Sequence, residues 1–162
     1  MDKGCFYFIK NEYFEEFKDP FLMTNKERVG EETHNRPCFY AFYEEKTKLF
    51  WMIPFSSKVD KFKKIYNDKI SKYKVCDTIM FGNVLGHEKA FLLQNMCPII
   101  DKYILNEYRD INNIPVRVEE IFEKELISKA KKVLTLYRKG IKLIFPNVQI
   151  IENKLVKLLW LL

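Results

Sequence analysis

The chain is poor in the residues on which several kinds of chemistry depend. Its 162 residues include only two histidines, five glycines and six prolines. Chemistry that uses several imidazoles is therefore nearly excluded, and the few glycines argue against a glycine-rich phosphate loop. No stretch approaches the roughly 18 apolar residues that a membrane-spanning helix needs. The first apolar run is also too short for a signal peptide, so we expect a cytoplasmic protein with no membrane partner.

The four cysteines are spread too widely to form a zinc or redox motif. The two nearest in sequence are 21 residues apart, so the chain has no CxxC pair. Each cysteine lies in an apolar stretch, which is typical of a buried thiol. We therefore expect free, buried thiols in a reducing cytosol. These residues are Cys5, Cys38, Cys76 and Cys97.

The overall composition is that of a folded domain with a basic charge balance. Hydrophobic residues make up 48% and charged residues 31% of the chain, which excludes a disordered or low-complexity protein. No linker or internal repeat divides the sequence, so residues 1–162 are expected to form one domain. The 28 Lys and Arg residues outnumber the 22 Asp and Glu residues, which gives a formal charge of +6. This excess favours an anionic partner.

Hydrophobic periodicity predicts an α+β fold with a compact antiparallel sheet. Strands are expected from short runs rich in aromatic and β-branched residues, and helices from the 3.6-residue spacing. The strands and helices do not alternate, which argues against a parallel sheet. The polar segment 24–35 contains Gly30 and is interpreted as a loop. The expected strands span residues 4–9, 38–43, 48–53, 75–81, 89–94 and 97–108, with a short helix as the alternative for 97–108. The expected helices span residues 11–18, 58–74, 118–139 and 147–162, the last with a buried apolar end at 158–162.

The junction between the third strand and the second helix is the strongest candidate for a binding site. The first N–H groups and the dipole of a helix attract anions. Ser56 and Ser57 add hydroxyl donors, Lys58 adds a charge, and Arg36 precedes the neighbouring strand. This combination suits a phosphate and contains no carboxylate cage for Mg²⁺. The alternative is structural, with Ser57 and Asp60 forming a capping box and the lysines simply solvated.

Other titratable residues allow different chemistry. Tyr13 follows the first strand, where it is a candidate for proton transfer or base stacking, with core packing as the alternative. A ribonuclease that uses two imidazoles would need His34 and His87 together. Nothing local in the sequence brings these two histidines together.

Four segments carry a resemblance to a known family. They are KGCFYFI at residues 3–9, RPCFYAF at 36–42, WMIPFSSK at 51–58 and FLLQNMCPI at 91–99. In order and in spacing, they resemble the toxins of type III toxin–antitoxin systems, the ToxN/AbiQ group, and its CptN branch most. The resemblance covers nearly the whole chain, and its most specific piece is the Pro-x-Ser-Ser-Lys segment.

The resemblance implies a metal-independent endoribonuclease toxin that needs no cofactor and cleaves RNA at adenine-rich sites. It implies a small, highly twisted, barrel-like antiparallel sheet with added helices, similar to the MazF/Kid toxins. The targets would be messenger RNAs, and the inhibitor would be a repeated RNA antitoxin that folds into pseudoknots. The toxin would cut the repeat precursor and bind the units in a basic groove. Protein and RNA would alternate in a closed assembly with few direct protein–protein contacts, and related systems abort phage infection.

The same resemblance suggests roles for individual residues. It places the family's hydroxyl pair at Ser56 and Ser57, its lysine at Lys58, its N-terminal tyrosine at Tyr13 and a basic residue near Arg36. ToxN itself has a proline before the lysine and a lysine near the position of the arginine. The RNA 2′-OH would attack the adjacent phosphorus and leave a 2′,3′-cyclic phosphate and a 5′-OH. Ser57 would bind the phosphoryl oxygens, Lys58 would offset charge or handle a proton, Tyr13 would stack or assist proton transfer, and Arg36 would act as a clamp.

Two basic surfaces are expected to contact RNA. The lysine face of the 58–74 helix would follow the backbone phosphates, and the end of the 118–139 helix would provide a second surface. Tyr40 is expected to stack on an unpaired base. Two other functions fit the same sequence: a non-catalytic RNA-binding module, and a MazF-type toxin with a protein antitoxin. The expected RNA contacts are Lys61, Lys64, Lys72, Lys131, Lys132 and Arg138.

Overall fold

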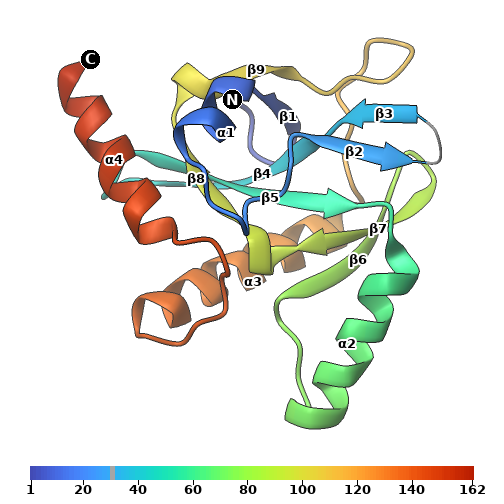
Figure 1. Cartoon of the computed structure of the whole chain (residues 1–162). Coiled ribbons are helices and arrows are strands. Elements are labelled where there is room, and N and C mark those ends of the chain that lie inside the picture. Colours follow the sequence, from blue (N-terminus) through green and yellow to red (C-terminus); the bar gives the residue numbers. More distant parts are fainter. Residues whose placement is uncertain (30–31) are drawn as a thin grey trace.

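The protein has the expected α+β class, with one seven-stranded antiparallel sheet and a separate two-stranded hairpin (Figure 1). The structure, a computed structural model, describes residues 1–29 and 32–162, and side chains outside 27–34. The main sheet contains β1 (Phe6–Ile9), β4 (Pro37–Glu44), β5 (Leu49–Ser56), β6 (Ile79–Val84), β7 (His87–Leu92), β8 (Cys97–Ile99) and β9 (Ile104–Glu107), and the hairpin contains β2 (Lys26–Val29) and β3 (Glu32–Asn35).

Strand β5 is the centre of the sheet because it pairs with three other strands. Along one edge it pairs with β4, and along the other edge it pairs first with β8 and then with β7. Met52 is paired with Cys97 of β8, whereas Ser56 is paired with Ala90 of β7. The 3-10 turn at Leu93–Asn95 separates β7 from β8. The last residues of β5 are therefore held by β7, in the sheet order β6-β7-β5-β4-β1-β9.

The sheet is strongly curled. Strands β8 and β9 are the two ends of the hydrogen-bonded path β8-β5-β4-β1-β9. In a flat sheet the four strand spacings of this path would separate them by about 19 Å. The connection from Ile99 to Ile104 passes through a 3-10 turn at Asp101–Tyr103 and spans at most about 15 Å. The sheet must bend to allow this connection. Among the described residues β6 and β9 remain unpaired edges, so the sheet does not close into a barrel.

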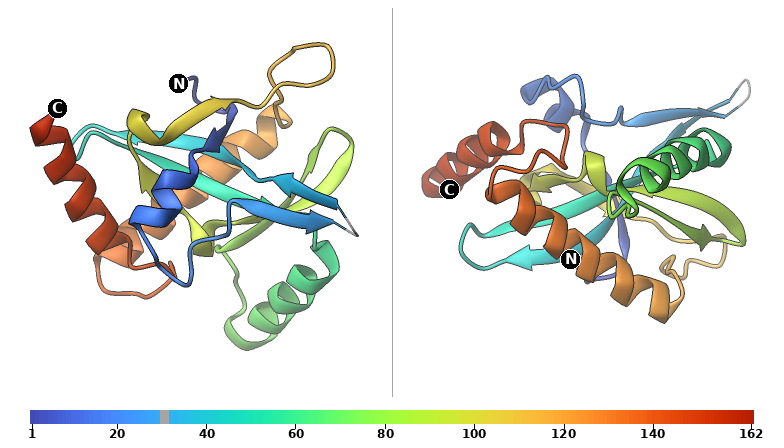
Figure 2. Two further views of the ribbon diagram at one scale, coloured as in Figure 1. Left: turned by 45° about the horizontal axis from the view of Figure 1, so that its top comes forward. Right: turned by 90° about the horizontal axis from the view of Figure 1, so that it is seen from below.

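Helices cover both faces of the sheet (Figures 1 and 2). On one face, Leu126 and Ala130 of α3 pack against aromatic residues of the central strands. On the other face, Tyr13 of α1 and Leu155 of α4 enter a second cluster, while Phe62 of α2 packs on β6 and β7. The helices are α1 (Asn11–Glu16), α2 (Val59–Tyr73), α3 (Glu120–Arg138) and α4 (Val148–Leu161).

Most expected elements are present, but the polar segment 24–35 is not the predicted loop. Its strands β2 and β3 pair in register, with Lys26 opposite Asn35. The hairpin lies outside the seven-stranded sheet, so its residues need no alternation of apolar and polar types. Hydrophobic periodicity in the sequence therefore does not indicate the β2–β3 hairpin. Gly30, on which the loop prediction partly rested, lies outside the described residues.

Two other expectations are corrected near the C-terminal half. Residues 97–108 form two strands separated by a 3-10 turn, because the chain must cross from β5 to β1. The predicted burial of the apolar end 158–162 is wrong for its last three residues, since Trp160 is 86% exposed and Leu162 is 83% exposed, whereas Leu158 and Leu159 are partly buried. The last fully buried residue of helix α4 is Leu155, and Leu158 and Leu159 pack at the margin of the core.

The predicted state of the cysteines is confirmed, because all four side chains are buried and free of disulfides. In the part of the chain that the structure describes, no helix has the length and apolar character required to cross a bilayer.

Leu126 tests the contact between α3 and the sheet. It is completely buried, whereas Ile121 of the same helix is 65% exposed. We expect Leu126→Ala to lower the free energy of unfolding by about 2–5 kcal/mol, because it removes buried methyl groups and leaves a cavity. Ile121→Ala should change it by less than about 0.5 kcal/mol. Urea denaturation measures both, and equal effects of the two substitutions would contradict this packing.

Candidate active site

The candidate site forms where β5 ends and α2 begins. Ser56 is the last residue of β5, is buried, and accepts a hydrogen bond at its Oγ from the Lys58 main-chain N–H at 3.1 Å. Helix α2 starts at Val59, and its N-cap residue, Lys58, makes no capping hydrogen bond through its side chain. The predicted capping box of Ser57 and Asp60 is therefore wrong. Ser57 has a different partner.

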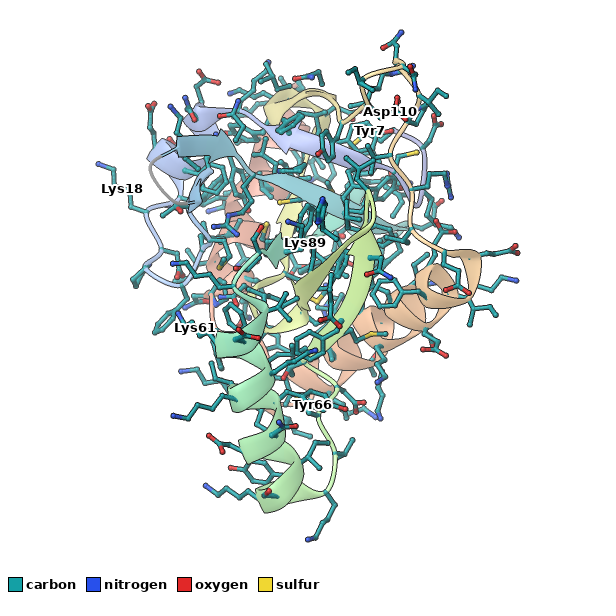
Figure 3. The ribbon with its side chains drawn as sticks, turned by 90° about the vertical axis from the view of Figure 1, so that its right-hand side faces the viewer. Tyr7, Lys18, Lys61, Tyr66, Lys89 and Asp110 are labelled. Atoms are coloured by element: carbon teal, nitrogen blue, oxygen red, sulfur yellow. The ribbon has the colours of Figure 1, made fainter. Side chains whose placement is uncertain are left out.

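The Ser57 hydroxyl accepts a hydrogen bond from Lys89 Nζ at 2.7 Å. Lys89 lies on β7, where it precedes the Ala90 that pairs with Ser56, so antiparallel pairing places it opposite Ser57. Figure 3 shows Lys89 beside the start of α2, with Lys61 on the outer side of that helix. Sequence analysis did not identify Lys89. The two residues are 32 positions apart, and only the pairing register of two strands brings them together.

Two basic groups next to this pair have different environments. Lys58 is exposed, and its ammonium group makes no ion pair within the residues that the structure describes. Arg36 is only 8% exposed, and its guanidinium donates to the main-chain oxygens of Thr24 and Phe55 at 2.9 and 2.8 Å. Arg36 therefore lies next to the serine pair as predicted, but beneath the surface. A buried arginine in this position supports the end of β5, whereas a residue that clamps a bound phosphate would need to be exposed.

The structure separates Tyr13 from this site. Its side chain is completely buried, and its hydroxyl donates to the main-chain oxygen of Pro98 at 2.8 Å. Its ring packs against Phe14, Phe17 and Tyr103. Burial raises the pKa of the phenol well above its ordinary value, so the group stays protonated. The predicted roles of Tyr13 in stacking and proton transfer do not fit this position, because a buried ring cannot meet a base.

Tyr40 is also a core residue. It is 5% exposed and packs edge-on against Phe50 and Tyr7. Burial raises the pKa of its phenol as well. The prediction that Tyr40 stacks on an unpaired base is therefore corrected, because its ring faces are already occupied by protein.

Most exposed lysines of α2 have no carboxylate partner among the described residues. The segment 58–74 contains seven lysines, Lys58 and Lys74 included, and two aspartates. Lys63 pairs with Glu88 at 2.9 Å, and Lys69 Nζ donates to Thr78 and Gln94. Within the described parts of the chain, the remaining predicted RNA contacts of this helix form no ion pair; these are Lys61, Lys64 and Lys72.

The basic residues of α3 are largely neutralised by carboxylates. Lys132 Nζ lies 2.7 Å from Asp77, and Arg138 forms ion pairs with Glu44 and Glu152. Lys131 is the exception, with its ammonium 5.8 Å from the centre of the Phe42 ring. The predicted RNA contacts Lys132 and Arg138 therefore have carboxylate partners in the free protein, and their contact with RNA stays a prediction.

Of the two histidines, the structure describes only the side chain of His87. His87 is an exposed residue at the start of β7, while the His34 side chain lies outside the described residues. In the portion of the chain that is described, no three His, Cys, Asp or Glu side chains come together as metal ligands.

No protein-family model and no curated protein matches the chain.

Tyr13→Phe separates a structural role from a catalytic one. The substitution leaves the Pro98 oxygen without its buried donor, so we expect the free energy of unfolding to fall by about 1–3 kcal/mol. At a temperature where the variant is folded, it should cleave RNA at the same rate as the parent protein. A rate that falls tenfold or more in a variant with unaltered circular dichroism would contradict the structural assignment.

Proposed function

We propose that the protein is a metal-independent endoribonuclease whose scissile phosphate binds at Ser57. The observation that carries this proposal is the 2.7 Å hydrogen bond from Lys89 Nζ to Ser57 Oγ at the start of α2. A hydroxyl that accepts from an ammonium group is polarised and becomes a stronger donor to an anion. The exposed Lys58 and the first N–H groups of a 15-residue helix add positive potential at the same point.

This arrangement suits transesterification of an RNA phosphodiester. The 2′-oxygen forms a bond to phosphorus as the bond from phosphorus to the 5′-oxygen breaks, so a cyclic phosphate and a 5′-OH result. The nucleophile belongs to the substrate, and the protein needs only to orient it, stabilise charge and move two protons. Ser57 would stabilise the phosphoryl oxygens. An ammonium group is suited to protonate the leaving 5′-oxygen, and Lys58 and Lys89 both flank Ser57.

The same proposal assigns the unpaired lysines of α2 to RNA binding. Lys58, Lys61 and Lys64 recur at three-residue intervals from the proposed phosphate site along the helix. A strand of RNA bound at Ser57 would therefore meet further cations as it continues along α2. The ion pairs on α3 make that helix a weaker candidate for RNA contact.

We also propose that this ribonuclease is a toxin of the ToxN/AbiQ type, inhibited by a repeated pseudoknot RNA in a closed protein–RNA assembly. The support is the four segments named above, together with the serine–lysine corner that one of them forms. A barrel-like, MazF/Kid-like architecture belongs to this proposal, and the curl of the sheet favours it. Tyr13 is not part of the proposed site.

Cleavage in EDTA tests the catalytic proposal. We expect the protein to cut adenine-rich RNA without divalent metal and to leave 2′,3′-cyclic phosphate ends, detected by mass spectrometry. Ser57→Ala should lower the cleavage rate at least about 100-fold, because it removes a donor to the transition state. Lys89→Met should also lower it strongly, because the serine then loses its ammonium partner.

Matched substitutions control for altered folding. Ser71→Ala changes an exposed serine later in α2, and Lys157→Met changes an exposed lysine of α4. Both should cut RNA at the parental rate. RNA binding without any cleavage would instead indicate a non-catalytic RNA-binding module.

The salt dependence of RNA binding tests the α2 surface. For a 2′-O-methyl RNA that cannot be cleaved, the double variant Lys61→Ala/Lys64→Ala should reduce the slope of log affinity against log salt by about 1.4, or about 0.7 per lost phosphate contact. Lys132→Ala should leave the slope unchanged, because its ammonium is paired with Asp77. Fluorescence anisotropy measures the slopes, and equal slopes for the two variants would rule out the α2 surface.

A further inference from the structure

A hollow of about 350 Å³ lies between β1, β9 and the base of the β2–β3 hairpin. Its walls combine apolar side chains with three primary amides from separate parts of the chain. Phe8 and Leu105 supply the apolar part, and Asn11, Asn25 and Asn35 supply the amides. The charged side chains in the lining are one lysine and one glutamate, so the hollow is not an anion site.

Two of the amides hold each other in place. Asn25 Nδ2 donates to Asn11 Oδ1. An amide carries two N–H donors and a carbonyl acceptor, so this bond leaves donors on Asn11 and an acceptor on Asn25. Exchanging the oxygen and nitrogen of both amides would leave the same set of groups. The linked pair therefore presents a donor and an acceptor side by side.

The apolar walls suit a flat ring. Leu105 is 58% exposed on the edge strand β9, and the half-buried Phe8 ring lies 5.4 Å from the Tyr108 ring. A planar group could slide against these side chains while its edge meets the amides. Nucleobases have both properties, because each combines an apolar face with adjacent donors and acceptors on one edge.

Arg36 connects the hollow to the candidate active site. The Arg36 N–H donates to the Asn25 main-chain oxygen at 2.8 Å, and the Arg36 guanidinium donates to the Phe55 oxygen at 2.8 Å. Phe55 precedes the serine pair by one residue. Asn35, which lines the hollow, directly precedes Arg36. Arg36 therefore joins the lining of the hollow to the end of β5.

We propose that this hollow is a subsite that binds one unstacked nucleobase of the RNA substrate, with Asn11 and Asn25 reading its edge. The inference rests on the proposed function for its substrate class. The base is held by its face against Phe8 and Leu105, and by its edge against the amide pair. Ser57 and the start of α2 bind the phosphate, and the hollow binds the base. The first site therefore recognises the RNA backbone and the second recognises the base.

The test compares nucleotides with a base-free analogue. The probes are AMP, CMP, GMP and UMP against ribose 5-phosphate, added to ¹⁵N-labelled full-length protein. Substitution of each asparagine assigns its side-chain NH₂ signals in the NMR spectrum. At least one nucleotide should shift the signals of Asn11 and Asn25 saturably, and ribose 5-phosphate should not. If no nucleotide exceeds ribose 5-phosphate, the proposal is wrong.

Two variants and one control make the test specific. Asn25→Leu should weaken binding of the best nucleotide about fivefold or more. Asn11→Asp keeps the acceptor that Asn25 uses but loses the donor, so it should weaken binding similarly while preserving the local fold. Asn153→Leu, at an exposed position of α4, should have no effect. Unchanged affinity in both hollow variants would overturn the assignment.

The NMR titrations, taken together with the RNA cleavage assay, distinguish a failure of this inference from a failure of the proposed activity. Base-dependent shifts at Asn11 and Asn25 in a protein that cuts no RNA would support the subsite and reject the ribonuclease. RNA cleavage that depends on Ser57, without any base-dependent shift at these amides, would support the ribonuclease and reject the subsite.

Discussion

The pairing register between β5 and β7 is the constraint on which the site depends. Ser56 is paired with Ala90, and the two strands are antiparallel. Ser57, which follows Ser56, therefore lies opposite Lys89, which precedes Ala90, and the Lys89 ammonium reaches the Ser57 hydroxyl. Successive side chains in a strand point to opposite faces, so a slip of one residue would turn Lys89 away from the serine. The core enforces the register, since Phe55 and Phe91 pair in the same ladder and their rings lie 5.4 Å apart. Packing of aromatic side chains thus determines where an ammonium group lies.

The distribution of ion pairs leaves more unpaired positive charge on α2 than on α3. Helices α2 and α3 both carry many lysines, but Asp77, Glu44 and Glu152 lie against α3. The lysines of the first turns of α2 lack such partners within the described residues, apart from the pair of Lys63 and Glu88. Positive potential is therefore concentrated next to Ser57. Charge that is already paired contributes little to binding of a distant anion.

Local sequence predicted those parts of the structure that depend on neighbouring residues. The helix after Lys58 and the central strands follow from periodicity, and the serine–lysine corner follows from adjacency. Residues that act through tertiary contacts could not be predicted in this way. Lys89 requires a strand register, and the burial of Tyr13 requires the position of β8, whose Pro98 oxygen accepts its hydroxyl. The neutralisation of Arg138 likewise requires α3, α4 and the β4–β5 turn to meet.

A crystal structure with an uncleavable RNA tests the central claim most directly. An oligonucleotide with a 2′-O-methyl group at the cleavage position keeps the phosphate and blocks the nucleophile. The account predicts a phosphoryl oxygen within hydrogen-bonding distance of Ser57 Oγ, with Lys89 still bound to that hydroxyl and the RNA continuing along α2. An RNA bound elsewhere on the protein, with the Ser57 corner filled only by solvent, would contradict it.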